Sequence, residues 1–153
     1  MKLIPFSDAD FASLYEFMSP LWHDTYDAII PPAQVDLLLD KYFGRDGLAH
    51  FRALGYEYYN IDNAGVLVCV EKADSIYIDK LYLRPSARGK GYPAFVFNEL
   101  IKRGKDLTLN ANRENKRAVA CYLKCGFVIE SETDIDVGSG FVNRDYTFRK
   151  KCK

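Results

Sequence analysis

A chain of 153 residues, 48% of them hydrophobic, is long enough to bury a sizeable core, so we expect one globular domain over residues 1–153 rather than a disordered chain. Lysine plus arginine equals aspartate plus glutamate at 21 each, and this zero net charge disfavours a nucleic-acid binder, which carries a basic excess. The N-terminal apolar stretch breaks off early, and no apolar run approaches the roughly 18 residues of a membrane span. We therefore expect a cytoplasmic protein with no signal peptide and no membrane contact.

The first part of the chain carries one strand pattern and two helix patterns. Residues 2–6 are typical of a strand, at a sheet edge because Pro5 has no amide hydrogen for a central ladder. Ser7 is a candidate N-cap for a helix that runs to about Met18. A second helical piece is expected over residues 21–30.

A third helix and a hairpin follow. Pro31–Pro32 precede residues 35–43, whose apolar side chains recur at helical spacing. Strand patterns over 57–62 and 65–73 flank a candidate turn at 63–65, which predicts a β-hairpin.

The second half of the chain alternates strands and helices. The expected elements are a strand over 76–83, a helix over 92–104, a strand over 107–112, a helix over 115–126, and paired strands over 127–137 and 141–150. Asn115 is a candidate N-cap of the second helix, and Gly126 closes it. This order predicts the α/β class with a mixed sheet.

The four cysteines give no metal-binding pattern. Cys69 lies in a strand pattern, Cys152 lies near the C-terminus, and Cys121 and Cys125 are one helical turn apart. Because no further cysteine or paired histidine is near, we expect thiols rather than a metal site.

A basic turn with two glycines, Arg88-Gly89-Lys90-Gly91, links the strand over 76–83 to the helix over 92–104. Glycines at a helix start let the backbone approach a phosphate, and the free amides of the first turn donate to it. The helix dipole and the basic side chains add positive charge. The alternative is a surface turn with two solvated basic residues.

Three phosphate-binding patterns compete for this turn. A Walker A loop requires a longer spacing between its glycines and a Lys-Ser/Thr pair, which the turn lacks. A dinucleotide fingerprint is closer, because Gly89, Gly91 and Ala94 satisfy G-x-G-x-x-A, but Pro85 ends the preceding strand too early. The third pattern includes Arg88.

In this third pattern the chain resembles the GNAT superfamily of N-acetyltransferases, whose coenzyme A signature is Q/R-x-x-G-x-G/A at a strand-to-helix junction. Arg88 and Gly91 match the signature, and the preceding LYLRP is similar to the apolar lead of the family. A second family motif, Asn-x-x-Ala-x-x-x-Tyr followed by Gly-Phe, recurs in register at Asn115, Ala118, Tyr122, Gly126 and Phe127.

The resemblance implies a GNAT-like α/β fold with a mostly antiparallel central sheet flanked by helices. It implies an enzyme that moves an acetyl group from acetyl-CoA directly to a primary amine of a small molecule or peptide, without a metal. It places the coenzyme A contacts at Leu81, Leu83, Arg88, Gly89, Lys90, Gly91, Tyr92, Ala94, Asn115 and Tyr122. One position departs, because Pro93 stands where the signature has Gly or Ala. Proline suits a first helical turn but has no amide, so a phosphate donor is lost if the family uses that amide.

Acetyl transfer needs a base for the amine, a hydrogen-bond donor for the oxyanion and a proton donor for the leaving thiolate. The resemblance implies that the backbone at 81–83 supplies the oxyanion donor and that Tyr122 supplies the proton; the alternative for Tyr122 is core packing. Asp79 lies inside an otherwise apolar strand, where burial raises a carboxyl pKa toward that of a useful base. A glutamate of the polyamine-acetylating branch occupies a similar position. The alternative for Asp79 is a salt bridge or a solvated edge.

The resemblance places acceptor binding on the first helices and the last hairpin, with four candidate residues: Trp22, Tyr26, Asp79 and Asp145. The spacing of the first two and the hairpin sequence are similar to spermidine/diamine-type N-acetyltransferases. An acidic stripe shares one strand face: Glu130, Glu132, Asp134 and Asp136. It would attract a cationic amine such as a polyamine, or it is a solvated face. Peptide N-termini, amino sugars and amino acids stay open as acceptors.

A second function class is a non-catalytic coenzyme A-binding or protein-interaction module on the same fold, and Pro93 keeps this alternative open. A dinucleotide-dependent oxidoreductase is the third. The oligomeric state is open, with a homodimer through paired edge strands as one alternative.

Overall fold

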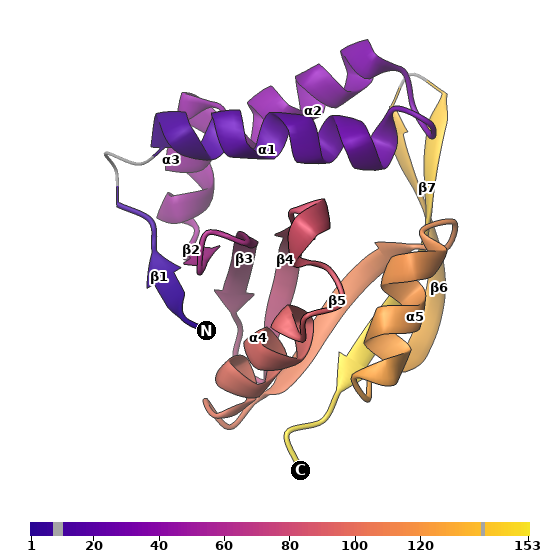
Figure 1. Ribbon diagram of the computed structural model, residues 1–153. Helices are drawn as coiled ribbons and strands as arrows, with labels where there is room; N and C mark the ends of the chain where they lie inside the picture. Colours follow the sequence, from indigo (N-terminus) through magenta and orange to yellow (C-terminus); the bar gives the residue numbers. More distant parts are fainter. Residues whose placement is uncertain (8–10, 139) are drawn as a thin grey trace. The chain divides into compact units, whose positions relative to one another are not determined.

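The computed structural model describes residues 1–7, 11–138 and 140–153, and Figure 1 labels its helices and strands. The chain divides into two compact units, each made of two separate stretches. Unit 1 comprises residues 1–68 and 80–90, and unit 2 comprises residues 69–79 and 91–153. Two strands, β3 (Gly65–Glu71) and β4 (Ser75–Leu83), pass from one unit into the other. The expectation of a single domain stays a prediction.

Unit 1 combines a strand edge with a layer of helices. Besides its parts of β3 and β4 it contains β1 (Leu3–Pro5), α1 (Phe11–Tyr26), α2 (Pro32–Phe43), α3 (Arg45–Ala53), β2 (Tyr56–Ile61) and a short 3₁₀ turn, η2 (Pro85–Ala87). Its strands follow the order β1-β2-β3-β4. β1 lies at the end of this order and pairs antiparallel with β2, so the expected edge strand is confirmed.

The first helix is continuous, so the expectation of two separate helical pieces is wrong. Pro20 lies inside α1, where a proline costs about 3 kcal/mol or more. Buried side chains recur at helical spacing on both sides of it: Leu14, Met18, Leu21 and Trp22. Burial of this shared face outweighs the cost of the proline.

No sequence pattern predicts α3, a short helix that directly follows α2. Its interior Gly47 weakens the local helix signal. An added Cβ at Gly47 would collide with the carbonyl oxygen of Lys41 on α2. The glycine therefore permits a close approach of two helices, which only the packing reveals.

The predicted β2–β3 hairpin is confirmed, with its turn earlier than expected. Asp62 and Asn63 adopt left-handed backbone conformations with φ of 51° and 57°, as a type I′ hairpin turn requires. Gly65, expected in the turn, is the first residue of β3. A Cβ there would collide with the carbonyl oxygen of Tyr82.

His23 joins the first two helices. Its Nδ1 lies 2.7 Å from Oδ1 of Asp27, and its Nε2 lies 2.7 Å from Oδ1 of Asp36 on α2. Both ring nitrogens donate only in the charged imidazolium. The hydrogen bonds to Asp36 and Asp27 raise the pKa of His23 above its ordinary value.

We expect the His23 contacts to stabilise the fold at low pH and to be lost as the pH rises. The folded-state pKa is raised, so the stabilisation is complete below the unfolded value of about 6.5 and disappears as the pH rises through the folded value. Between about pH 6 and pH 8.5, Tm should fall more steeply for the wild type than for His23→Gln. His50→Gln, at the exposed second histidine, is the control and should keep the wild-type slope. Equal slopes for the wild type and His23→Gln would contradict the contact.

Unit 2 contains two helices and the remaining strands. Its elements after β4 are α4 (Tyr92–Ile101), β5 (Asp106–Asn112), α5 (Lys116–Lys124), β6 (Val128–Gly138) and β7 (Phe141–Lys150). Its strands follow the order β3-β4-β5-β7-β6. β5 is parallel to β4, whereas β7 pairs antiparallel with both β5 and β6. The predicted α/β class with a mixed, mostly antiparallel sheet is confirmed.

Both expected ends of α5 are confirmed. The side-chain oxygen of Asn115 accepts a hydrogen bond from the amide of Ala118 at 3.3 Å, which is an N-cap. Gly126 follows the helix with φ of 92°, a left-handed conformation that favours glycine.

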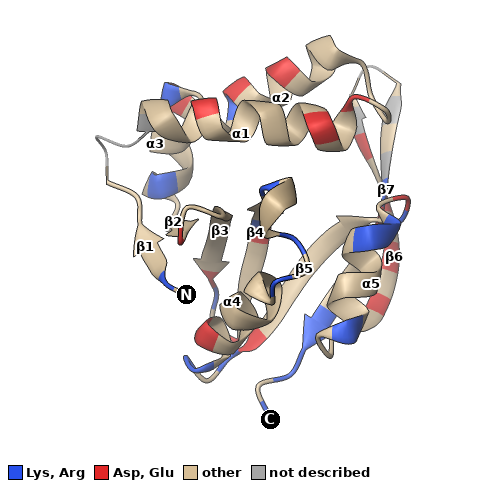
Figure 2. Cartoon of the chain, in the orientation of Figure 1, with Lys and Arg blue, Asp and Glu red and all other residues tan. Residues whose placement is uncertain are grey.

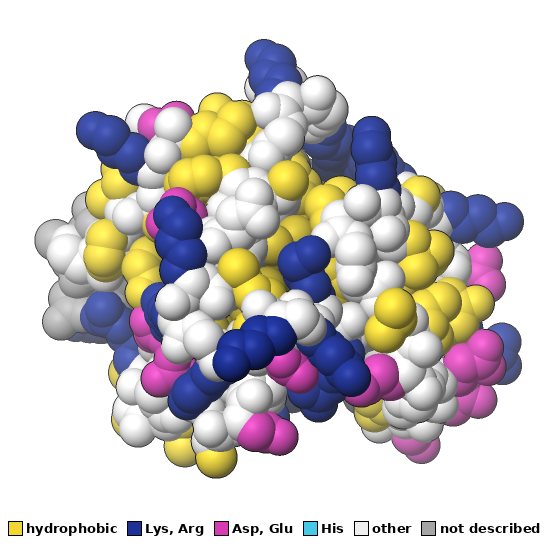
Figure 3. Space-filling view, turned by 90° about the horizontal axis from the view of Figure 1, so that it is seen from below, with side chains coloured by type: hydrophobic (Ala, Val, Ile, Leu, Met, Phe, Trp, Pro, Cys, Tyr) yellow, Lys and Arg dark blue, Asp and Glu magenta, His cyan; other side chains and the backbone are white. Residues whose placement is uncertain are grey.

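None of the helices within the described ranges is long and apolar enough to cross a membrane. On the face shown in Figure 3, lysine and arginine side chains lie beside acidic and hydrophobic ones. This mixture agrees with the zero net charge of the chain.

Candidate functional site

The glycine turn between β4 and α4 has a backbone that favours glycine at two positions. Gly89 and Gly91 adopt φ of 76° and 85°, and no atom lies within 4 Å of an added Cβ at either. Gly91 is the N-cap of α4, and Pro93 lies in the first helical turn. The first amides of a helix have no acceptor within it. The turn therefore offers open space, backbone donors and the positive end of a helix dipole, a combination that fits a phosphate group.

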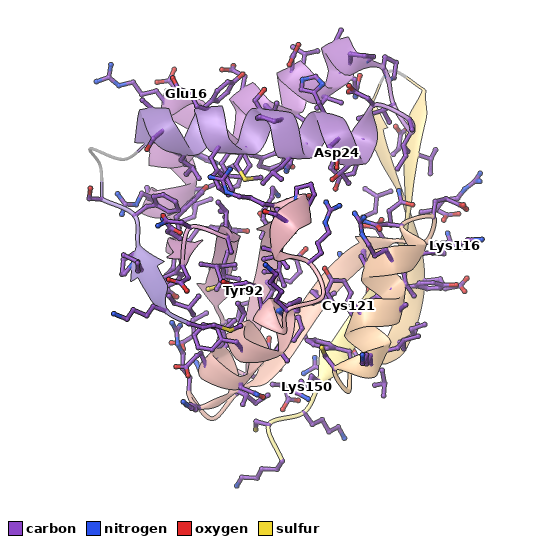
Figure 4. The ribbon with its side chains drawn as sticks, viewed as in Figure 1. Glu16, Asp24, Tyr92, Lys116, Cys121 and Lys150 are labelled. Carbon is purple, nitrogen blue, oxygen red and sulfur yellow. The ribbon has the colours of Figure 1, made fainter. Side chains whose placement is uncertain are left out.

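The arginine of this turn contacts α1. Arg88 Nη2 lies 3.7 Å from Oδ2 of Asp24, and both side chains remain partly exposed. Figure 4 labels Asp24 in the C-terminal half of α1. A partly exposed ion pair with so long an N–O distance contributes little to the free energy of unfolding. The guanidinium can therefore exchange the Asp24 carboxylate for another anion.

Tyr122 lies on α5 with its ring edge-on to three phenylalanines of unit 2. The ring centroids are 6.1 Å from Phe97, 6.0 Å from Phe127 and 5.6 Å from Phe148. These three side chains are at most 2% exposed, whereas Tyr122 is half-buried. The ring is thus packed against the core while the side chain still reaches solvent, so packing and a chemical role are compatible.

The two acidic candidates differ in environment. Asp79 on β4 is half-buried, and its role as the base stays a prediction. Burial raises the pKa of Asp145 on β7, and the positive charge of Arg113 partly opposes this shift. A carboxyl pKa raised by burial is therefore found at Asp145. Residue spacing alone carried no signal for this, because it depends on the environment of the folded β7.

Arginine side chains form ion pairs with the acidic stripe on β6. Arg113 pairs with Glu132 and Asp134, and Arg149 pairs with Glu130 at 2.7 Å. Figure 2 shows the acidic residues of β6 in red. Three of the four carboxylates of the stripe, Glu130, Glu132 and Asp134, are thus paired with arginines within unit 2.

The two aromatic candidates on α1 do come together. The rings of Trp22 and Tyr26 are 5.8 Å apart, and the Tyr26 hydroxyl lies 2.7 Å from the hydroxyl of Tyr82 on β4. Trp22 also contacts the ring of Tyr42 on α2, at 6.2 Å. Neither Tyr42 nor Tyr82 is among the residues that the sequence predicts for a site. The only sequence signal at Tyr42 is its helical spacing.

The cysteines are all free. Burial raises the pKa of the Cys121 thiol to about 11, and the neighbouring Cys125 adds to the shift. Figure 4 labels Cys121 on α5, next to Tyr122 in the sequence. A thiol with so high a pKa is a poor nucleophile at neutral pH.

The predicted residues divide between the two units. Unit 1 contains Trp22, Tyr26, Leu81, Leu83, Arg88, Gly89 and Lys90, and unit 2 contains Asp79, Gly91, Tyr92, Ala94, Asn115, Tyr122 and Asp145. Leu81 and Leu83 are half-buried on β4, and Tyr92 begins α4, where Figure 4 labels it. Asn115 has the local role of capping α5.

A family model described as "Acetyltransferase (GNAT) family" matches residues 14–127. Over 60 residues the chain is 30% identical to the peptidyl-lysine N-acetyltransferase YjaB of Escherichia coli (strain K12). This stretch spans 39% of the chain and 41% of that relative's length.

Solved structures share the fold across nearly the whole chain. The PaiA N-acetyltransferase of Thermoplasma acidophilum, in complex with coenzyme A, is similar with a TM-score of 0.75 and 21% identity over 98% of both chains. A chimera of the spermidine N-acetyltransferase SpeG from Vibrio cholerae and hSSAT is similar with a TM-score of 0.66 and 17% identity, covering 99% of this chain and 97% of the other. At these identities the likeness concerns the fold.

Proposed function

Because the chain belongs to the acetyltransferase (GNAT) family, we propose that it transfers an acetyl group from acetyl-CoA directly to a primary amine of a small molecule or a peptide. The observation that carries this proposal is the glycine turn, with two left-handed glycines at the start of α4. The high pKa of Cys121 supports direct transfer rather than an acyl-cysteine route.

In this proposal the chain holds acetyl-CoA through the turn and the strand before it. The backbone amides that would donate to its phosphates are those of Gly89, Lys90, Gly91, Tyr92 and Ala94, and Arg88 would add positive charge. Leu81 and Leu83 on β4 would offer backbone groups to acetyl-CoA. Asn115 and Tyr122, which belong to the second family motif, are the remaining proposed contacts. Bound acetyl-CoA would supply the acyl group as an activated thioester.

Tyr122 is the proposed proton donor, through its phenolic hydroxyl. An ordinary tyrosine keeps this proton at neutral pH because its pKa is near 10. The phenylalanines around the ring hold it in place, and a fixed ring orients the hydroxyl without loss of rotamer freedom at each turnover.

Asp79 and Asp145 are the two candidates for the base. An acceptor amine with a pKa of about 10.4 is mostly protonated at neutral pH, so a base must remove a proton. Asp145 joins Asp79 because burial raises its pKa, and a carboxylate of higher pKa is a stronger base.

We expect one of Asp79→Asn and Asp145→Asn to lower kcat by about 10²-fold or more and to remove the acid limb of the pH–rate profile, while the other stays near wild type. The base acts as the carboxylate, so activity is present above its pKa and falls as the pH drops through it. Turnover measured from about pH 5 to pH 9 on both variants identifies the base. Two variants with wild-type rates would remove both residues from this role.

Replacing Pro93 by alanine should tighten coenzyme A binding. The change restores a backbone donor, and one hydrogen bond to a charged group contributes about 1.5–3 kcal/mol, or about 10- to 100-fold in Kd. Loss of the fixed φ should lower stability by about 0.4–1 kcal/mol. Calorimetric titration and Tm measure the two effects. An unchanged Kd would show that the amide at position 93 does not face the phosphate.

The acceptor is proposed only as a primary amine. YjaB is named for peptidyl-lysine and SpeG for spermidine, and both acceptors are alkyl amines. The test is release of free thiol from acetyl-CoA on addition of each member of an amine panel. It is accompanied by a thermal shift, because ligand at a hundredfold excess over Kd stabilises a protein by about 2.7 kcal/mol.

Stabilisation by coenzyme A together with amine-dependent thiol release is the expected result. Stabilisation without thiol release for any amine would favour the non-catalytic module. The absence of any shift at millimolar coenzyme A would overturn the cofactor assignment.

A further inference from the structure

Two of the four cysteines form a pair at the C-terminal end of α5. Cys121 lies in the last turn of the helix, and Cys125 is its C-cap. The amide of Cys125 donates to the carbonyl oxygen of Cys121 at 3.0 Å, so one closed helical turn joins the two residues. Both residues are half-buried, and their thiols hydrogen-bond to each other. We call these two residues the dithiol pair.

The helical turn sets a spacing that suits a bridging ion better than a disulfide. Residues four apart on a helix have Cβ atoms about 5–6 Å apart, whereas a disulfide needs a Cβ–Cβ distance of about 3.5–4.5 Å. A metal ion between two thiolates adds two bonds of about 2.3 Å each, as for zinc and sulfur, so the two sulfur atoms lie roughly 4.6 Å apart. The dithiol pair can span this distance without unwinding the turn.

The end of the helix is also held by contacts beyond the pair. Nζ of Lys150 on β7 donates to the carbonyl oxygen of Cys125 at 2.7 Å, and the amide of Phe127 donates to the carbonyl oxygen of Tyr122 at 3.0 Å. Figure 4 labels Lys150 and Cys121. These hydrogen bonds fix the backbone around Cys125. The dithiol pair is therefore preorganised, and its backbone resists the distortion that a disulfide would require.

The charges beside the dithiol pair suit an anionic complex. Lys150 binds the Cys125 carbonyl, and the positive charge of Lys124 acts on the Cys121 thiol. Two thiolates and one monovalent cation together carry one net negative charge, which nearby ammonium groups stabilise.

The number of ligands distinguishes between metal ions. Structural Zn²⁺ takes four protein ligands. Within the described ranges, no group of three or more histidine, cysteine, aspartate or glutamate side chains could hold a metal ion. Thiolates select soft ions such as Cu(I), for which two thiolates complete a linear coordination. The dithiol pair therefore favours a soft monovalent ion over zinc.

We propose that Cys121 and Cys125 form a binding site for the soft monovalent ion Cu(I), which bridges their two sulfur atoms. Both S–H bonds break, two S–Cu bonds form and two protons pass to the solvent, without a change of oxidation state. The cysteine spacing predicts plain thiols for metals that need further cysteine or histidine ligands, and Cu(I) does not need them. The site goes beyond the proposed function and does not depend on it.

Competition with a coloured chelator tests the site. The full-length protein, reduced and kept without oxygen, is titrated into the Cu(I) complex of bicinchoninic acid, whose colour is lost as the protein takes up the ion. We expect uptake of one Cu(I) per chain. In a parallel titration with Zn²⁺ and a zinc indicator, we expect a much lower affinity.

Variants assign the uptake to the dithiol pair. Cys121→Ser and Cys125→Ser should each abolish it, because neither variant can supply two sulfur ligands. Cys152→Ser is the matched control and should retain it, because Cys152 is also half-buried but lies after β7, where its thiol donates to the carbonyl oxygen of Gly104. Lys150→Met should weaken the uptake several-fold, and Lys150→Arg should restore it. Melting curves recorded without metal show that each variant is folded.

The proposal is overturned if the folded Cys121→Ser and Cys125→Ser variants take up Cu(I) as the wild type does, or if Cys152→Ser loses the uptake. Equal affinities for Zn²⁺ and Cu(I) would overturn the assignment to a soft ion. A Cys121–Cys125 disulfide formed with oxidised glutathione and detected by peptide mass spectrometry would overturn the spacing argument. Thiol release from acetyl-CoA tests the proposed function separately, and neither result decides the other.

Discussion

Replacing Tyr122 by phenylalanine is expected to lower kcat by about 10²–10⁴-fold, the usual contribution of a general acid. The change removes only the hydroxyl and keeps the ring that packs against Phe97, Phe127 and Phe148. Acetyl-CoA affinity and Tm should therefore change little. The high-pH limb of the pH–rate profile should change as well, because it reports loss of the phenolic proton.

A matched control for this variant is Tyr146→Phe. Tyr146 on β7 is also half-buried, and its ring is edge-on to Phe148 at 6.1 Å. It should keep the wild-type rate. A rate for Tyr122→Phe within about threefold of wild type, well below the general-acid range, would assign Tyr122 to packing alone.

Gly91→Val is expected to weaken coenzyme A binding by about 10- to 100-fold or more, equivalent to at least one lost charge-assisted hydrogen bond. Gly91 has φ of 85°, a conformation that strains a β-branched residue, and its Cβ position is open. The valine Cβ meets no atom of the chain within 4 Å, but the substitution strains the backbone before α4 and fills the space in which a phosphate would lie.

Gly104→Val provides the control for backbone strain. Gly104 follows α4 with φ of 80°, and its Cβ position is open in the same way. Both variants should lose stability by a similar amount, about 1–3 kcal/mol, but only Gly91→Val should lose affinity in calorimetric titration with coenzyme A. Equal affinities for the two folded variants would make Gly91 a turn residue without contact to the ligand.

Local signals in the sequence determined the ends of several elements and the position of the glycine turn. Asn115 caps α5, Gly126 follows it, and Gly91 lies directly before α4, each as the residue type predicts. These features depend on a single residue's φ or on a hydrogen bond across one helical turn. Such preferences are the same in any fold, so they can be derived from sequence.

The tertiary structure decided the features that depend on distant neighbours. The sequence predicts two helical pieces, one ending at about Met18 and one over residues 21–30, but the shared buried face of α1 keeps the helix continuous across Pro20. Gly47 weakened the signal for α3, and only the approach of α2 explains it. In both places the free energy gained by packing exceeds the cost of the residue's low helix propensity. For a glycine this cost is about 1 kcal/mol.

The chemistry of the candidate residues depended still more on the fold. Burial raises the pKa of Asp145 on β7. Three carboxylates of β6 are paired with Arg113, which follows β5, and with Arg149 on β7. Lys80 reaches Trp22 and Tyr42 from a strand that lies far along the chain from α1 and α2. The sequence by itself determined the family motifs and the turn, because their geometry is local. The tertiary structure decided which carboxylates are paired with arginines and which cation lies over the rings of Trp22 and Tyr42, because burial and electrostatic contacts join residues that the sequence separates.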